Sequence, residues 1–157
     1  MSDLLPPFTD VHDALFTLSL PATWDLAQRA SDVVRLVACE PGRADAGFRA
    51  NATVVAGSVN DLGFTDWQRG CDELLGRTLA DWLLVDLERL TVSGHEAVRR
   101  LGHHRVGGTA VTMEQVAVLA GGTGLTVTLS AETAAYDSLA DVFAATVDSL
   151  GVRGPRG

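Results

Sequence analysis

Four apolar-rich segments separated by glycine turns occupy residues 83–131, and this pattern constrains the fold more than any other. The segments read LLVDLERLTV, EAVRRLGHHRV, TAVTMEQVAVLA and LTVTLSA, and the turns fall within SGHE, GG and GGTG. Two-residue loops that contain Gly favour hairpin turns whose twist matches that of the flanking strands. We therefore expect a four-stranded antiparallel meander.

The turn of a hairpin fixes which residues lie opposite each other. If residues 94–95 form the first turn, Asp86 lies opposite His103 and Val85 lies opposite His104. This register predicts a contact between Asp86 and His103, with His104 packed beside Val85.

The second hairpin has Gly107-Gly108 as its turn, which places His103 opposite Thr112 and His104 opposite Val111. Neighbouring strand residues point to opposite faces of a sheet, so the two histidines cannot bind one ion from a regular strand. His95 is eight residues from His103, roughly 26 Å along a strand. His12 stands alone near the N-terminus, and we expect no metal site.

Two helices are expected outside the meander. Thr65 and Gln68 have the spacing of a capping box, and Ser138 with Asp141 suggests a cap for the second helix, which ends before Gly151. The two helices have these apolar stripes: Trp67, Cys71, Leu74, Leu75, Thr78 and Trp82 in the first, and Leu139, Val142, Phe143, Thr146, Val147 and Leu150 in the second.

Further strands are expected over 14–21, 32–40 and 48–59. The register leaves both faces of the meander apolar over part of their area, so both faces need a cover. The fold class is therefore α+β, an antiparallel sheet with helices on its faces in an α/β/α sandwich. Either the helices divide between the faces or the N-terminal loops help. A chain of 157 residues suits a single domain (core 15–150), with flexible termini at 1–10 and 152–157.

Arg89, Arg100 and Gln115 fall in one row of the predicted sheet. Like charges placed opposite each other are unfavourable, so we expect either solvation of the arginines or an acidic group that offsets them. That group is either internal, Asp72 or Glu73 of the first helix, or the carboxylate of a ligand or partner. In the second case the row is an anion-recognition patch, because arginine forks match carboxylates.

Two other positions are candidates for binding. Trp24 follows a proline turn and either closes over the end of the sheet or anchors a partner, since exposed tryptophans often dominate interfaces. Gly102, placed near Leu87 and Met113, leaves space for a pocket between sheet and helix. Cys39 and Cys71 are expected to be reduced thiols.

The composition disfavours several classes of function. The formal charge is −8 and no basic run is present, which argues against nucleic-acid partners and anionic membranes. No export signal or membrane span is visible, so we expect a cytoplasmic protein. No nucleophile elbow, Walker loop or dinucleotide fingerprint occurs, and no pair of carboxylates stands out as an acid/base couple. An enzyme and a cofactor are therefore not expected.

The order of several short motifs resembles a known family. FTLSLPATW, FRANATVV, VSGHEAVRR, VTMEQVAVLAGGTGLTVTLSA and VDSL, spread over residues 15–150, are similar to the LpqN/LpqT lipoproteins of actinobacteria, within the PsbP- and DcrB-like fold. Asn51, Arg99 and Gln115 match motif positions, and we expect structural roles for most of them.

The resemblance implies an antiparallel sheet between helices and a non-catalytic role, usually binding a protein partner as an adaptor or secretion-associated chaperone. This chain has no lipobox cysteine, unlike the lipoprotein members. We expect a protein-interaction module, with a small-ligand-binding domain as the alternative. Its candidate binding residues are Arg89, Arg100, Gln115 and Trp24.

Overall fold

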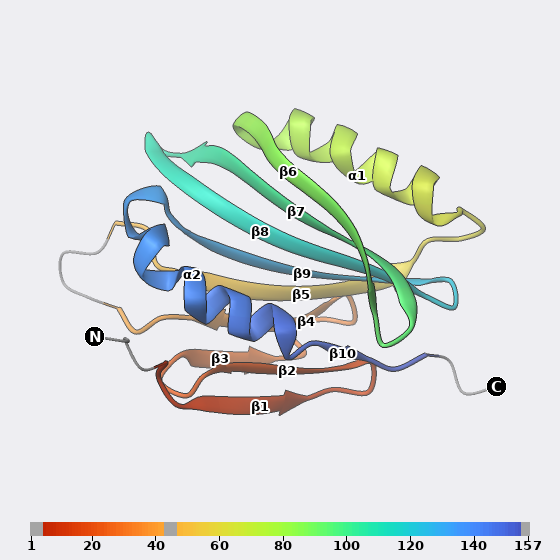
Figure 1. Ribbon diagram of the computed structural model, residues 1–157, viewed down its shortest axis with the longest axis horizontal. Coiled ribbons are helices and arrows are strands. Elements are labelled where there is room, and N and C mark those ends of the chain that lie inside the picture. The colour runs from red at the N-terminus through yellow and green to blue at the C-terminus, as the bar shows by residue number, and fades with distance from the viewer. Residues whose placement is uncertain (1–4, 43–46, 155–157) are drawn as a thin grey trace.

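The computed structural model describes residues 5–42 and 47–154, which fold into two helices and two antiparallel sheets (Figure 1). The larger sheet has the order β3-β4-β5-β9-β8-β7-β6 and the smaller one β1-β2-β10. The strands are β1 (Phe8–His12), β2 (Phe16–Pro21), β3 (Asp25–Gln28), β4 (Val34–Cys39), β5 (Asn51–Ser58), β6 (Ala80–Val92), β7 (His95–Val106), β8 (Thr109–Ala120), β9 (Thr123–Glu132) and β10 (Gly151–Val152), and the helices are α1 (Phe64–Thr78) and α2 (Thr133–Asp148).

The two helices lie on opposite faces of the larger sheet (Figure 1). Arg100 bonds to α1 whereas Glu114 bonds to α2, and these residues point to opposite faces because Arg100 lies opposite Gln115, the neighbour of Glu114. The smaller sheet lies on the same face of the larger sheet as α2. The expected α+β class, with helices on both faces of an antiparallel sheet, is confirmed.

The main core lies between the larger sheet, α2 and the smaller sheet. Alternate residues of the strands face it, as the period-2 pattern requires. Its fully buried side chains are Phe16, Leu18, Leu20, Leu36, Ala38, Ala52, Val54, Val116, Val118, Leu125, Val127, Leu129, Ala131 and Phe143. The strand expected over 48–59 is present as β5, and its side chains alternate between the core and the other face of the sheet. Ala52, Val54 and Ala56 are buried, as is Ala50 just before the strand.

The larger sheet curls until its β6–β7 hairpin reaches the C-terminal strand (Figure 1). The backbone N–H of Val152 donates to Ser93 Oγ at 3.0 Å, and that of Arg153 donates to the Leu15 carbonyl at 2.9 Å. The ends of the chain that we expected to be flexible are therefore partly ordered. Phe8–Asp10 belong to β1 and pair with β2, and Val152 of β10 pairs with Phe16 of β2.

Both expected helix caps are wrong. Gly63 is the N-cap of α1, so Thr65 lies inside the helix and the Gln68 side chain accepts from Arg100 instead. The second helix begins at Thr133, and Ser138 Oγ donates to the Ala135 carbonyl within it. Spacing alone does not fix a cap, because the residue at the cap must also leave the helical backbone conformation.

The first hairpin turns at Ser93-Gly94, one residue earlier than expected. Both residues have positive φ, 52° and 79°, which suits the left-handed turn that hairpins prefer. The register next to the turn therefore shifts by two, so that Asp86 lies opposite Leu101, and a bulge between Leu84 and Asp86 shifts the residues before it by one more. His103 lies opposite Leu83, not Asp86, and the predicted Asp86–His103 contact is wrong. The same changes remove the expected pairing of Val85 with His104.

The second hairpin has the expected register. Gly107 and Gly108 form its turn, and His103 pairs with Thr112 and His104 with Val111. His103 Nδ1 lies 3.0 Å from Thr112 Oγ1, which in turn contacts Thr133 of α2. His104 occupies the opposite face and is buried.

Gly124 of β9 lies directly beneath the Trp67 side chain of α1, so a substitution there can test how α1 packs on the sheet. A Cβ at Gly124 would lie 2.5 Å from the Trp67 ring, whereas a Cβ at its cross-strand partner Gly57 would meet nothing within 4 Å. We expect Gly124→Ala to lower the free energy of unfolding by about 1–3 kcal/mol through overpacking. Gly57→Ala is the matched control and should stay within about 0.5 kcal/mol of the wild type. Urea unfolding followed by circular dichroism measures both, and equal effects would contradict this packing.

Candidate functional site

The Arg100 guanidinium is the centre of the polar contact between α1 and the sheet. Its side chain is 0% exposed. Nε donates to Asp72 Oδ1 at 2.8 Å, one terminal nitrogen donates to Gln68 Oε1 at 2.7 Å and the other to Gln115 Oε1 at 3.2 Å. A buried charge needs this degree of compensation, because removing it from water costs several kcal/mol.

The positions of these partners follow from helical spacing and from the strand register. Gln68 and Asp72 are four residues apart and therefore share one face of α1. Gln115 lies directly opposite Arg100 on β8, and its Nε2 donates to Thr128 Oγ1 on β9.

The internal alternative is confirmed for Arg100, which pairs with Asp72. The predicted row is wrong, because Leu87 and not Arg89 lies opposite Arg100. Arg100 therefore attaches α1 to the sheet, Gln115 supports Arg100, and both side chains already have hydrogen-bond partners.

Arg89 is the exposed member of the row. It lies on the same face as Arg100, displaced by two residues from the expected register because Val98 is its partner. Its guanidinium carbon lies 5.4 Å from the centroid of Phe64, and one N–H group donates to Thr65 Oγ1 at 3.2 Å. An arginine has five N–H donors, so Arg89 keeps donors for another acceptor.

A cavity of about 260 Å³ opens between α1 and the β6–β7 hairpin. We call it the α1 cavity. It brings together Arg89 and Arg100 of the predicted row but not Gln115. The residues that line it are Phe64, Thr65, Gln68, Arg69, Asp72, Leu87, Arg89, Val98 and Arg100.

The pocket expected above Gly102 is filled. A Cβ at Gly102 would lie 2.1 Å from the Trp82 ring, so the indole of Trp82 occupies the space beside this glycine. Gly102 is therefore a site of close packing, and the cavity between sheet and helix lies further along β6, at Leu87.

Strand β6 exposes an apolar run at the end of the larger sheet. Leu83, Leu84, Val85 and Leu87 are 60%, 39%, 50% and 47% exposed. We call these four residues the β6 patch. Their strand is the last in the sheet order, so its outer backbone edge has no neighbouring strand within the described residues. Sequence reasoning missed this patch because it assumed that both faces of the meander were covered.

Trp24 is 8% exposed and belongs to the main core. Its indole therefore supplies packing at the end of the sheet rather than open contact surface. This is the first of the two alternatives that the sequence left open for Trp24.

A second polar cluster lies beneath α2. Glu114 accepts a bond from Tyr136 Oη and another from Arg99 at 2.8 Å, and its side chain is nearly fully buried. Burial and the bond to Glu114 raise the pKa of Tyr136 above its usual value. Arg99 therefore has a structural contact. On the opposite face of the sheet, burial lowers the pKa of His104.

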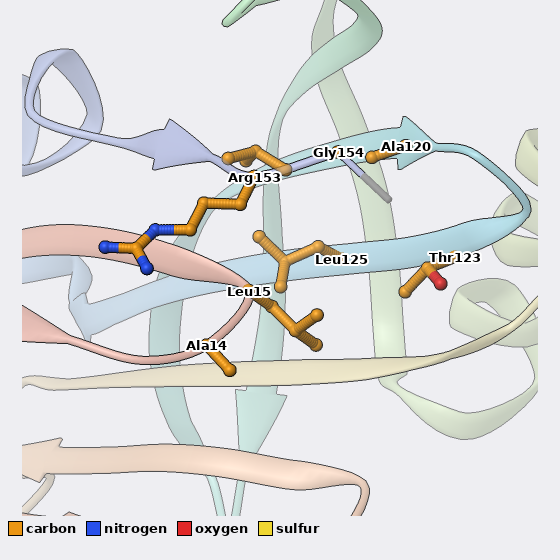
Figure 2. Close-up of a pocket in the computed structure, with 8 residues that line it drawn as sticks. Ala14, Leu15, Ala120, Thr123, Leu125, Arg153 and Gly154 are labelled. Atoms are coloured by element: carbon orange, nitrogen blue, oxygen red, sulfur yellow. The ribbon is translucent and has the colours of Figure 1, made fainter. Parts of the chain in front are cut away.

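A smaller cavity of about 170 Å³ lies near the C-terminus, between the β1–β2 turn and the β8–β9 hairpin. Figure 2 shows Leu15 and Leu125 at this cavity, with the Arg153 guanidinium pointing away from Thr123. Arg153 is the charged residue of its lining, and most of its other side chains are apolar. No sequence pattern pointed to it, because its walls come from segments more than 100 residues apart.

Within the described residues, no group of three or more His, Cys, Asp or Glu side chains is placed to hold a metal ion. Cys39 and Cys71 are free thiols. None of the described helices is long and apolar enough to cross a membrane.

Comparisons with solved structures place the fold. The chain resembles LpqN of Mycobacterium tuberculosis, a protein involved in cell envelope biogenesis, with a TM-score of 0.72 and 18% identity over 95% of this chain and 91% of LpqN. It also resembles cyanobacterial PsbP (CyanoP) of Synechocystis, with a TM-score of 0.71 and 16% identity over 98% and 96% of the two chains.

A third similar structure is PA94 of Pseudomonas aeruginosa, a putative regulator of unknown function, with a TM-score of 0.67 and 18% identity over 96% and 97% of the chains. The similarity to these structures shows that the molecule has a PsbP-like fold. No family model matches the sequence, and no curated protein matches it.

Arg100 should be far more important for stability than an exposed arginine on the same strand. We expect Arg100→Met to lower the free energy of unfolding by about 1–3 kcal/mol, because it leaves the oxygens of Gln68 and Gln115 without their donor, whereas the half-exposed Asp72 regains water. Arg105→Met is the control, since Arg105 and Asp81 form an exposed pair at 3.6 Å. That pair should contribute less than about 1 kcal/mol. Chemical denaturation measures both, and comparable losses would refute the central role of Arg100.

Tyr136 is the single tyrosine of the chain, so its titration can be followed directly. Because its pKa is raised in the folded state, the unfolded chain loses this proton first, and stability falls as pH rises above about 10. We expect tyrosinate absorbance near 295 nm to appear together with the loss of the circular dichroism signal. Chain unfolded in urea should titrate at about 10. Tyrosinate formed near that pH in a folded protein would contradict the bond to Glu114.

Proposed function

We propose that this chain is a non-catalytic protein-interaction module that docks its partner on the β6 patch. One observation carries the proposal: four large apolar side chains are exposed on the outermost strand of the larger sheet. An exposed apolar edge strand is a template for pairing with another chain. Partners use such edges by adding a strand, with backbone hydrogen bonds for affinity and side-chain contacts for specificity.

The similar structures support a non-catalytic role. They include LpqN, a cyanobacterial PsbP and a putative regulator. We further propose that the chain is a distant member of the LpqN/LpqT group and acts as an adaptor or a secretion-associated chaperone. The short motifs over residues 15–150 and the shared fold support this assignment.

A small-ligand-binding role is the second candidate. The observation that favours it is the α1 cavity, which combines apolar walls with arginine side chains. Pockets that bind small molecules typically have this composition, an apolar lining with a few polar groups in fixed positions.

The β6 patch is tested by affinity purification of the tagged full-length chain from its native cells. We expect a stoichiometric protein partner with the wild type and its loss in the double variant Leu83→Glu, Val85→Glu. The matched control is Leu26→Glu, Val33→Glu, which adds the same charge to apolar residues that are similarly exposed, 43% and 56%, elsewhere on the surface.

The control should keep the partner. Because all four side chains are exposed, both variants should fold normally, which circular dichroism checks. If the partner remains bound to the β6 variant, or if the wild type retains no protein, the proposed docking surface is wrong.

A further inference from the structure

We propose that the α1 cavity is a binding site for a carboxylate attached to an apolar group. Leu87 belongs to both this cavity and the β6 patch, whereas the other lining residues lie outside the patch. The inference rests on the second candidate function, small-ligand binding at this cavity, and is independent of docking at the β6 patch. A cavity of this chemistry accepts the carboxylate of a free small molecule or that of a peptide terminus.

Charge is the first argument. Three arginines and one aspartate line the cavity, so its formal charge is +2 in a chain whose net charge is −8. Asp72, the one carboxylate of the lining, is already paired with Arg100. Arg69 pairs with Asp66 at 3.1 Å, so Arg89 is the cation of the lining that is not paired with a carboxylate of the described residues. A locally positive cleft in an acidic protein concentrates the field on its ligand.

Arg89 supplies the donors. It is exposed, it makes one hydrogen bond to Thr65, and its guanidinium is placed over Phe64. A guanidinium held against a ring presents a planar fork that matches the two oxygens of a carboxylate. Arg69 stands nearby and pairs with Asp66 at 3.1 Å, but both side chains are well exposed, so this pair costs little to exchange.

Gln68 adds an unsatisfied donor. It lines the cavity and is 7% exposed, and its Nε2 has no hydrogen-bond partner. The orientation of the amide is fixed, because Oε1 must be the atom that accepts from Arg100. A buried donor left without a partner is unfavourable, and a ligand oxygen that reaches it removes that penalty.

Gln68 Nε2 is buried, so a ligand oxygen reaches it only after the Gln68 side chain or α1 moves. That movement is opposed by the Arg100 contact and by the packing of Trp67 on Gly124, which lowers the affinity. Binding would add a partner for Nε2 and for Arg89 together.

Apolar walls define the rest of the ligand. Phe64, Val98 and Leu87 line the cavity beside the arginines. Its volume of about 260 Å³ exceeds the roughly 150 Å³ of an engineered cavity that binds benzene. A short alkyl chain or a single ring therefore fits behind the carboxylate.

Isothermal titration calorimetry with sodium hexanoate tests the site on the full-length protein. We expect one site with a dissociation constant on the order of 1 mM, the range of weak small ligands. Hexan-1-ol and hexylamine, which share the chain but lack the carboxylate, should bind at least tenfold more weakly. Similar binding of the alcohol would overturn the proposal, because an apolar cavity alone would then explain it.

Three variants locate the site. Arg89→Ala should weaken hexanoate at least tenfold. Gln68→Glu should do the same, because it keeps an acceptor for Arg100 while replacing the free donor with a negative charge. Arg153→Ala is the matched control, since it removes one arginine from the other cavity and should leave binding unchanged.

Failure of hexanoate to bind the wild type, equal binding by Arg89→Ala and the wild type, or loss in Arg153→Ala would overturn the assignment. Circular dichroism confirms that each variant is folded. A final arm compares acetyl-Gly-Val-Leu with a free C-terminus and with an amidated one. Arg89-dependent binding of the free form, tighter than that of hexanoate, identifies a protein C-terminus as the source. Preference for hexanoate identifies a free small acid.

Discussion

The buried guanidinium of Arg100 is the interaction on which the position of α1 depends. The helix buries few of its apolar side chains, so its attachment relies on Gln68 and Asp72 meeting the arginine, with Gln115 completing the set. A single residue, Leu79, separates α1 from β6. The contact at Arg100 therefore also influences where the edge of the larger sheet begins and how the α1 cavity is shaped.

The two faces of the larger sheet differ in how completely they are covered. On one face, α2 and the smaller sheet enclose a continuous apolar core, and the Ser93–Val152 bond closes that side. On the other face, α1 covers part of the sheet through the polar contacts of Arg100 and a small apolar cluster of Phe64 and Trp67. This imbalance explains why the features that suit binding, the β6 patch and the α1 cavity, both lie beside α1 rather than near α2.

Much of the fold was predictable because its signals are local. The meander, the register of the second hairpin and the helix-on-both-faces class follow from alternation and from glycine turns. The internal partner Asp72 was also foreseen as one of two alternatives. The turn of the first hairpin differs from the prediction because Ser93, not His95, takes the left-handed conformation with Gly94. A residue other than glycine gives little sequence signal for that conformation. The bulge before Asp86 has no sequence signal either.

The sequence by itself determined the two helices, the four strands of the meander and the strands near β2, β4 and β5, since strand and helix periods depend only on neighbouring residues. The short strands β1, β3 and β10 were not expected. Tertiary structure decided which surfaces are covered. The apolar run at Leu83–Val85 was expected in a meander covered on both faces, yet it is exposed at the edge of the sheet. The sequence left two alternatives open for Trp24, and only the fold shows that it is buried. Burial depends on residues distant in the chain, and local patterns carry no information about them.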